Sequence, residues 1–421
     1  MKKVVIVGGG LAGLTAAFYL SKHSDYEIEI FEAQEVIGGR VQTIDVKGFK
    51  FNYGAFMIFP WYKSFNKLLH ELKYDHNSEH LDIDKEYSWD STEKLFHRIN
   101  RHWTYDDAPI AALLKALPTF LTHEAELYNP DPARFDGQSV KQYIDDLSNE
   151  DERALDAINK LIVGYTYGAI YQLPMSIYFG FAKEILIHSG FKHVKALSRG
   201  ADRVVSKLEE ALLERGVSLH TSSPVELDKN LKASVLEKPL EYDYLIMATA
   251  ENNLLSPLLG IENPVAFNDH YVAMVKTENK VYVNGESDWN LLYTATLDDS
   301  VPQLTCIANL ENTFPEKPKN SLITYLRIPT SKSSSYDLVK AKQEIIDQIC
   351  KVLSNPGKVS VEFIHHWENT MPILGIEALA KIQSMQGVDK IFFAGDYMGA
   401  PSMEVAVRSG EEAARLIVDS P

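Results

Sequence analysis

Residues 3–13 of this 421-residue chain, KVVIVGGGLAG, carry the clearest indication of its fold class. The first half of this stretch, residues 3–7, is short and, after Lys3, entirely apolar and β-branched, which is typical of a central strand in a parallel sheet. Residues 11–21 follow with helical periodicity, and residues 27–32 predict a second strand. Strand, turn, helix and strand within about 30 residues form a βαβ unit. The sequence therefore predicts an α/β fold.

Glycines occupy the turn between this strand and this helix in the spacing G-x-G-x-x-G. Gly8 permits the tight turn, Gly10 lets the backbone approach a pyrophosphate, and Gly13 lets the helix pack closely on the sheet. The helix start at Leu11 and Ala12 adds free N–H groups and a partial positive charge. The spacing predicts a Rossmann-type domain that binds a dinucleotide.

Glu32 ends the second strand, 19 residues after Gly13. A carboxylate at this place can accept hydrogen bonds from both ribose hydroxyls of an adenosine. Because the same carboxylate repels a 2′-phosphate, it argues against NADP as the ligand.

A second motif, EAQEVIGGRVQT at residues 32–43, narrows the choice of cofactor. It resembles the E-A-x(4)-G-G-R-x-x-T signature of the superfamily of flavin amine oxidases, protoporphyrinogen oxidases and phytoene desaturases. The resemblance implies cofactor contacts from Ala33, Gly38 and Gly39, with Arg40 offsetting the pyrophosphate charge. A nicotinamide dehydrogenase has no need of this motif, so the expected cofactor is FAD, bound without a covalent link.

The segment FNYGAFM at residues 51–57 is similar to the family segment that passes the reactive face of the flavin. The family often has Asp where this chain has Asn52. Compared with that Asp, Asn52 keeps a hydrogen-bonding side chain but lacks the negative charge. Close approach to the ring needs a residue without a side chain, here Gly54. The resemblance implies that the cofactor contacts in this segment are Gly54, Ala55, Phe56 and Met57.

The segments IFFAGD at residues 391–396 and SGEEAA at 409–414 resemble the family's C-terminal signature. The likeness implies that Gly395 and Asp396 contact the ribityl chain or the pyrophosphate region. It also places a helix start near the N1–C2=O edge of the flavin, where a positive helix end stabilises the anionic reduced ring. The residues implied at this helix start are Met403, Glu404, Val405 and Ala406.

Two shorter likenesses lie between these ends of the chain. Val225 follows a predicted strand at the place where the family clasps the adenine through a backbone bond. Residues 243–249, DYLIMAT, resemble the family strand that returns to the sheet and ends at Ala248. A second G-x-G-x-x-G does not occur, so a separate NAD(P)H domain is not expected.

The order of predicted elements is α/β, helical, α/β, antiparallel β and again α/β. This order favours a discontinuous FAD-binding domain, residues 1–61, 195–255 and 385–421, interleaved with an α+β substrate-binding domain, residues 62–194 and 256–384. The substrate segments predict helices at 62–72, 111–121, 150–163 and 336–353, and strands at 271–275, 280–283, 304–310, 322–327 and 359–365. The FAD segments add helices at 202–214 and 403–418, and strands at 217–220, 244–248 and 391–394.

Composition limits the partners. The formal net charge of −16 argues against nucleic acid. Cys306 and Cys350 are isolated, so neither a disulfide framework nor a zinc site is expected, and a reducing cytoplasm fits. Since no stretch of about 20 apolar residues occurs, a transmembrane span is not expected, while peripheral membrane contact and the oligomeric state stay open.

Flavin chemistry would take a hydride at N5, and the protein would supply orientation, electrostatics and water exclusion. The aromatic and apolar insertions favour a mostly apolar small molecule as substrate, with oxygen or a quinone as electron acceptor. The candidates for the cavity wall are Met57, Trp61, Tyr167, Tyr171, Tyr293, Tyr325, Trp367 and Met398. Trp367 is preferred because HWENTMP at 366–372 resembles the W-x(4)-P run that family members place beside the flavin. With Met57 and Tyr397, which follows Asp396, it completes the set of candidate catalytic residues.

Three further features of the sequence are candidates for alternative sites. His365 and His366 would face opposite sides of a strand and so would not form a ligand pair. Lys276 is a candidate for the lysine that some amine oxidases hold near N5. The basic residues between 94 and 102 fit either a solvated helix face or a mouth for an anionic substrate.

Two other functions stay open. Residues 56–62, 323–327 and 385–387 look similar to segments of a bacterial flavoprotein that isomerises double bonds in polyunsaturated fatty acids. Such an isomerase would return the hydride at another carbon, with no net oxidation. Prenyl-protein escort and dissociation-inhibitor proteins also resemble this fold, but they act by binding alone.

Overall fold

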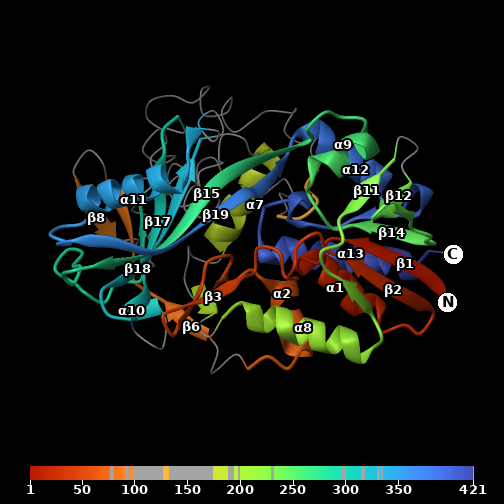
Figure 1. Cartoon of the computed structure of the whole chain (residues 1–421), viewed down its shortest axis with the longest axis horizontal. Helices are drawn as coiled ribbons and strands as arrows, with labels where there is room; N and C mark the ends of the chain where they lie inside the picture. The colour runs from red at the N-terminus through yellow and green to blue at the C-terminus, as the bar shows by residue number, and fades with distance from the viewer. Residues whose placement is uncertain are drawn as a thin grey trace.

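The computed structural model describes residues 1–75, 80–90, 94–98, 127–131, 174–187, 194–197, 200–228, 232–294, 300–313, 318–329, 332 and 335–420. The described chain forms two lobes, and both termini lie at the outer end of one of them (Figure 1). The predicted helices at 111–121 and 150–163 lie outside these residues, as do Tyr167 and Tyr171.

The lobe that holds the termini is built on a parallel sheet. Its described strands run in the order β10-β2-β1-β14-β20. The central strand β1 (Lys2–Val7) pairs in parallel with β2 (Tyr26–Phe31) and β14 (Tyr244–Met247). The outer strands are β10 (Ser218–His220) and β20 (Ile391–Phe393). Segments far apart in the sequence thus share one sheet, which confirms the predicted fold class.

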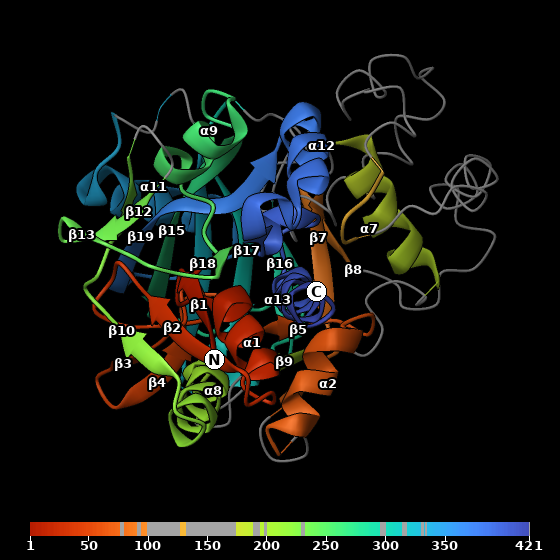
Figure 2. The same ribbon diagram turned by 90° about the vertical axis from the view of Figure 1, so that its right-hand side faces the viewer.

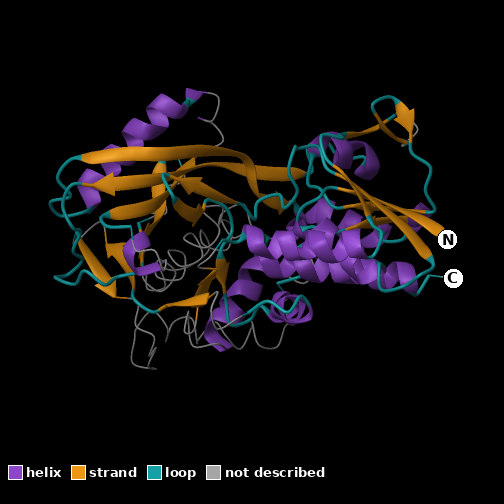
Figure 3. Cartoon of the chain, turned by 60° about the horizontal axis from the view of Figure 1, so that its bottom comes forward, coloured by secondary structure: helices purple, strands orange, loops and turns teal. Residues whose placement is uncertain are grey.

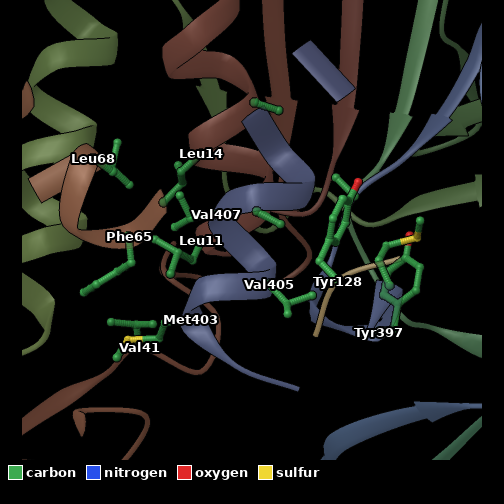
Figure 4. Packing of buried hydrophobic residues seen from close by; sticks show 14 of the residues in the cluster. Leu11, Leu14, Val41, Phe65, Leu68, Tyr128, Tyr397, Met403, Val405 and Val407 are labelled. Atoms are coloured by element: carbon green, nitrogen blue, oxygen red, sulfur yellow. The ribbon is translucent and has the colours of Figure 1, made fainter. Parts of the chain in front are cut away.

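Helices cover this sheet (Figure 2). The first, α1 (Leu11–Leu20), packs against α13 (Met403–Val418) so closely that a Cβ on Gly410 would lie 2.3 Å from the carbonyl oxygen of Ala12. Val405 and Val407 of α13 belong to the same buried cluster as Leu11 and Leu14, and Figure 4 shows Val405 on the side of the helix toward Tyr128. The other helices of this lobe are α2 (Lys63–Glu71), α8 (Asp202–Glu214), α9 (Asn252–Leu259) and α12 (Ile376–Met385).

The second lobe holds a larger sheet (Figure 3). Its described strands run in the order β19-β15-β18-β17-β16-β7-β8. Its longest members are β15 (Val265–Thr277) and β19 (Val359–Leu374), which pair antiparallel. The remaining strands are β18 (Ser321–Ile328), β17 (Gln303–Asn309), β16 (Leu291–Tyr293), β7 (Glu86–Asp90) and β8 (Leu95–Arg98). Among these described strands, β16 and β7 pair in parallel, and the other neighbouring pairs are antiparallel.

The two faces of this sheet pack against different partners. Tyr271 and Leu326 face α11 (Leu338–Val352), whose Ile345 joins them in one buried cluster. Val272 and Tyr325 belong instead to the core that continues into the first lobe. We call the face that carries Val272 and Tyr325 the inner face.

Short elements connect the lobes. The hairpin of β3 (Thr43–Val46) and β4 (Phe49–Asn52) precedes β5 (Met57–Ile58), which pairs with β9 (Val194–Leu197). The remaining described elements are β6 (His80–Ile83), α7 (Met175–Ile187), β11 (Val225–Leu227), β12 (Ala233–Val235), β13 (Lys238–Pro239) and α10 (Leu310–Thr313).

Two local predictions were wrong. Residues 280–283 form no strand, because Asn284 and Gly285 adopt positive φ angles of 51° and 81° and turn the chain back, leaving one isolated bridge between Val283 and Glu286. The basic residues from 94 to 98 lie at strand β8 rather than on a helix face. Arg101 and His102 lie outside the described residues.

Candidate cofactor and active site

The glycines of the first turn differ in what their lack of a side chain allows. Gly8 has a φ of +109°, and a Cβ there would lie 2.5 Å from the carbonyl oxygen of Ala248. A Cβ on Gly13 would lie 2.1 Å from the carbonyl oxygen of Gly8. Gly10, the N-cap of α1, has an ordinary φ of −74°, and its Cβ would meet nothing within 4 Å. The protein's own packing thus requires Gly8 and Gly13, whereas Gly10 borders open space at the helix start.

The second glycine motif forms a wall of the same space. Gly38 donates its N–H to the carbonyl oxygen of Gly9 over 2.8 Å. A Cβ on Gly39 would approach the Cα of Gly10 to 3.2 Å. Gly38 and Gly39 both have positive φ angles, so the bend between them favours glycine. The two motifs, about 30 residues apart in sequence, therefore meet at Gly10.

Glu32 organises the adenosine end of this space. One carboxylate oxygen accepts the N–H of Gly9 at 2.7 Å, and the other accepts that of Gln34 at 2.9 Å. Ala33 beside it is exposed. The carbonyl oxygen of Glu32 accepts the N–H of Ser223, two residues before the buried Val225. The predicted ribose and adenine residues thus lie at one end of the parallel sheet.

Arg40 and Asp396 form a bidentate ion pair that the sequence did not predict. The two N–O distances are 2.7 and 2.6 Å. The Asp396 side chain is 10% exposed and the Arg40 side chain 36% exposed. The pair holds the guanidinium in place, and its exposed part keeps N–H donors for an anion, because arginine carries five of them.

The segment at residues 52–55 is fixed to this arginine. Ala55 donates its N–H to the carbonyl oxygen of Arg40 over 2.8 Å, and a Cβ on Gly54 would lie only 2.0 Å from that oxygen. Gly54 is thus required by contact with the protein backbone.

Asn52 is a buried structural residue. Its amide oxygen accepts from Thr43 and from the N–H of Ala201, and its amide nitrogen donates to the carbonyl oxygen of Leu197 over 2.6 Å. Because an ionised Asp cannot donate to a carbonyl oxygen, this contact explains why the chain has Asn here.

The C-terminal signature places a helix start beside these loops. Gly395, with a φ of +157°, donates its N–H to Ser409 over 2.8 Å. Ser402 caps α13 by accepting the N–H of Val405, and its carbonyl oxygen accepts that of Ala406. Of the four residues predicted at this helix start, Val405 and Ala406 thus use their N–H groups within the cap, and a cofactor contact of Met403 and Glu404 stays a prediction.

The side chain of Glu404 has a different partner. Its two carboxylate oxygens accept the N–H groups of Ser64 and Phe65, each at 2.9 Å, and so cap the start of α2. Burial raises the pKa of Glu404 above its ordinary value. The Met403 and Val405 side chains are buried in the core (Figure 4).

Trp367 lies in an aromatic cluster between the two lobes. Its Nε1 donates to the carbonyl oxygen of Tyr53 over 2.7 Å, and its ring stacks on the Tyr53 ring with centroids 5.2 Å apart. His365 meets both rings edge-on. Phe56 stacks on Tyr325 of the inner face at 6.5 Å. The predicted flavin-facing segment and the inner face thus touch through aromatic rings.

The other catalytic candidates have different surroundings. Met57 is half-buried on β5 beside β9. Tyr397 is fully buried and donates its hydroxyl to the carbonyl oxygen of Met247, and burial raises its pKa well above the ordinary value. Tyr397 therefore ties the C-terminal segment to β14.

The remaining wall candidates are placed as follows. Tyr293 and Tyr325 share the inner face, while Trp61 stacks on Phe59. Met398 is buried, and its carbonyl oxygen accepts the N–H of Asn129.

The structure separates the two histidines and leaves Lys276 away from the cluster. His366 stacks on Tyr271, on the opposite side of β19 from His365, which confirms their predicted orientation. Lys276 is exposed, six residues beyond His270 along β15. Nothing in the described residues brings it to the aromatic cluster.

Sequence reasoning missed His270, which is 2% exposed on β15 directly opposite Trp367. Its signal is a polar residue within a run of buried positions, which is visible only once the register of three strands is known.

Neither a metal centre nor a membrane helix emerges from the described residues. They contain no group of three His, Cys, Asp or Glu side chains able to hold a metal ion. Among them, no helix is both long and apolar enough to cross a bilayer.

A family model described as flavin containing amine oxidoreductase matches residues 11–418. A 1-hydroxycarotenoid 3,4-desaturase of Flavobacterium sp. (strain P99-3) is 41% identical over 54 residues, 13% of this chain and 11% of that one. An L-amino-acid oxidase of Crotalus adamanteus is 23% identical over 271 residues, 59% of this chain and 49% of that one. The matched regions thus span at most about half the length of these curated relatives.

Solved structures share the fold over the whole chain. A fatty acid isomerase from P. acnes superposes with a TM-score of 0.73 at 14% identity, covering 99% of this chain and 98% of that one. Cyclohexylamine oxidase from Brevibacterium oxydans IH-35A gives 0.70 at 16% identity, with 99% of both chains covered. At these identities the likeness concerns the fold alone.

Proposed function

Because the chain belongs to the flavin containing amine oxidoreductase family, we propose that it binds FAD without a covalent bond and oxidises a mostly apolar small molecule. The family match confirms the class of enzyme that the motifs predict, an FAD-dependent oxidoreductase. Residues of the two lobes support the finer assignment.

The observation that carries the proposal is the open space over Gly10. Two glycine motifs and the start of α1 converge there, yet a Cβ on Gly10 would touch no protein atom. A glycine at an unstrained, unobstructed position is explained by a ligand that approaches the backbone. The N–H groups at the helix start suit a pyrophosphate.

The neighbouring groups fit the rest of FAD. Glu32 would hold the ribose hydroxyls, the exposed part of Arg40 would face the phosphates, and the start of α13 would face the flavin. Cys306 is buried, which raises the pKa of its thiol and keeps it protonated, so it is a poor nucleophile for a covalent link.

When bound, flavin supplies a hydride acceptor at N5. The chain's own residues would orient the substrate and exclude water. Trp367 and Tyr53 form a stacked wall between the lobes. The inner face continues this wall with Val272, Met274 and Ile323, all buried and apolar. Such a surface favours an apolar substrate over a small polar amine, and oxygen or a quinone would then reoxidise the cofactor.

Anaerobic bleaching of the FAD-loaded protein tests this function. The panel is the small hydrophilic amine putrescine, together with benzylamine, coproporphyrinogen III, neurosporene and linoleic acid. We expect an apolar member to bleach the flavin. Bleaching by hydrophilic amines alone would contradict the apolar preference, and a colourless protein that does not take up FAD would contradict the cofactor. Failure to take up FAD would favour a protein that acts by binding alone, without catalysis.

A double-bond isomerase is the second candidate function. Two of the three segments that look similar to the fatty acid isomerase meet in space, since Phe56 stacks on Tyr325. The third segment lies elsewhere, where Gln386 binds the backbone of Phe393. An isomerase would turn over under anaerobic conditions without any acceptor, whereas an oxidase or desaturase consumes one equivalent of acceptor per turnover.

A further inference from the structure

The start of α2 is capped by a residue of another helix. Both carboxylate oxygens of Glu404, in the first turn of α13, accept N–H groups of α2, one from Ser64 and one from Phe65, each at 2.9 Å. The first turn of α2 contains no acidic residue, and its N-cap, Tyr62, makes no capping bond through its side chain. Because the first N–H groups of a helix have no partner within the helix, α2 depends on α13 for its cap.

The capping contact is buried, whereas a second contact between the same helices is exposed. Glu404 is 6% exposed, and its burial raises the pKa of the carboxyl group. Glu411, about two turns farther along α13, pairs with Lys67 of α2 at the surface. Loss of a buried carboxylate leaves N–H groups without an acceptor, which costs more than loss of an exposed ion pair. Glu404 is therefore the residue expected to hold the two helix starts together.

The segment before α2 is fixed at both of its ends. At its beginning, Ala55 donates its N–H to the carbonyl oxygen of Arg40 over 2.8 Å. At its end, where the chain enters α2, Glu404 accepts the N–H of Phe65. The part of the chain that is predicted to pass the flavin, residues 54–57, thus belongs to a segment that is anchored to Arg40 on one side and to Glu404 on the other.

The contacts return to Arg40 through α13. Ser409 of this helix accepts the N–H of Gly395 over 2.8 Å. The next residue, Asp396, forms the bidentate ion pair with Arg40, with N–O distances of 2.7 and 2.6 Å. Arg40, the segment before α2, α2 itself, α13 and Asp396 therefore form a closed circuit of contacts. Glu404 makes a buried polar link between α2 and α13 in this circuit.

The residues proposed for the adenosine and pyrophosphate end of FAD are held by other contacts. Glu32 accepts the N–H of Gly9 over 2.7 Å. Gly10 pairs with Gly38 in an isolated bridge between the two glycine motifs. These contacts do not pass through α2. Loss of the link between α2 and α13 should therefore loosen the flavin end of the site rather than the adenosine end.

We propose that Glu404 is a positioning residue for the flavin end of FAD. This proposal rests on the proposed function, in which FAD binds with its flavin at the start of α13. By holding α2 against α13, Glu404 keeps residues 54–57 at a fixed place relative to that helix start. The two predicted sides of the flavin ring thus keep one geometry, while the adenosine and pyrophosphate end is held independently by Glu32 and Gly10.

Titration of the apoprotein with two ligands tests this role without turnover. FAD carries both ends of the cofactor, whereas ADP carries only the adenosine and the two phosphates. Glu404→Ala should weaken FAD binding by about tenfold or more, because α2 and residues 54–57 are then no longer held to the start of α13. It should leave ADP binding within about twofold of that of the unmodified protein. The visible circular dichroism of bound FAD, which reports the surroundings of the flavin ring, should change as well.

Two further variants complete the test. Glu404→Gln keeps the size of the side chain and one carbonyl acceptor, so its FAD affinity should lie between those of the unmodified protein and Glu404→Ala. Glu411→Gln is the matched control, because it removes a carboxylate of the same helix that contacts α2 at the surface. It should leave FAD affinity, ADP affinity and the dichroism unchanged.

The outcomes separate this role from the proposed function. Equal weakening of FAD and ADP binding in Glu404→Ala would assign the residue to general stability and would overturn the proposal. Unchanged FAD affinity and dichroism in Glu404→Ala would overturn it as well, and both results would leave the cofactor assignment standing. Failure of the unmodified protein to take up FAD would instead contradict the proposed function, and the positioning role with it.

Discussion

Glu32, the proposed ligand of the ribose, accepts hydrogen bonds from two N–H groups of the protein itself. Its carboxylate accepts from Gly9 and Gln34. Glu32→Ala should weaken FAD affinity by about 1–3 kcal/mol, because it strands the hydrogen-bonding groups that the carboxylate satisfies. Titration of the apoprotein with FAD, followed by flavin fluorescence, measures the change. Glu35→Ala, exposed in the same loop, is the control, and an unchanged affinity in Glu32→Ala would place the ribose elsewhere.

Trp367 combines a stacked ring with a hydrogen bond to Tyr53. If this ring orients the substrate, Trp367→Ala should slow flavin bleaching by about tenfold or more, since misplacement of a reactant by about 1 Å is costly. Trp367→Phe keeps an aromatic ring but loses the N–H donor, so its bleaching rate should lie between those of the unmodified protein and Trp367→Ala. Unaltered bleaching and substrate affinity in Trp367→Ala would assign the residue to the core.

Two glycines at the start of α1 are expected to serve different purposes: Gly13 allows the chain to fold, and Gly10 allows the cofactor to bind. Gly10→Ala introduces a Cβ that touches no protein atom, whereas Gly13→Ala forces one to 2.1 Å from the Gly8 carbonyl oxygen. Gly10→Ala should therefore keep its thermal midpoint but bind FAD at least about tenfold more weakly, a loss of about 1.4 kcal/mol. Gly13→Ala should lose about 1–3 kcal/mol of stability. Calorimetry measures the stability of each variant, and FAD titration measures its affinity for the cofactor. Normal FAD binding by Gly10→Ala would contradict the proposal that the pyrophosphate lies against Gly10.

The joint between α2 and α13 should respond to pH. Burial raises the pKa of Glu404 above its ordinary value of 4.5. A raised folded-state pKa gives stability that is present at low pH and is lost as the pH rises through that pKa. Glu404→Gln removes this titration, so the gap in unfolding free energy between the two proteins should narrow from about pH 4.5 upward. Urea unfolding at several pH values measures the gap, and a constant or widening gap would contradict the assignment.

Elements with one clear face were predictable from the sequence. The helices at 202–214 and 403–418 have the predicted bounds, since each has a regular apolar stripe. β15 and β19 extend well beyond their predicted ends because β15 is buried on both faces and β19 carries irregularities. Residues 280–283 look like a strand, but the Asn284-Gly285 turn decides their conformation.

At the scale of the whole molecule, some features of the candidate site were predictable from the sequence and others were not. The meeting of the two glycine motifs beside Glu32 was predictable because it follows from local spacing, whereas their contacts with a cofactor stay a prediction. The partners of Arg40 and Asn52 were not, since Asp396 and Leu197 lie 356 and 145 residues away. His270 and Thr370 likewise meet only through strand pairing across 100 residues. Motif spacing identifies a residue, whereas its partner depends on tertiary contacts.

Anaerobic absorbance of the FAD-loaded protein, with the product analysed by mass spectrometry, tests whether the protein oxidises an apolar substrate. We expect an apolar member of the panel to bleach the flavin and to yield a product lighter by two hydrogens. The flavin should then stay reduced until oxygen or a quinone is admitted. Sustained anaerobic conversion of linoleic acid to a product of equal mass, with no acceptor consumed, would contradict the account.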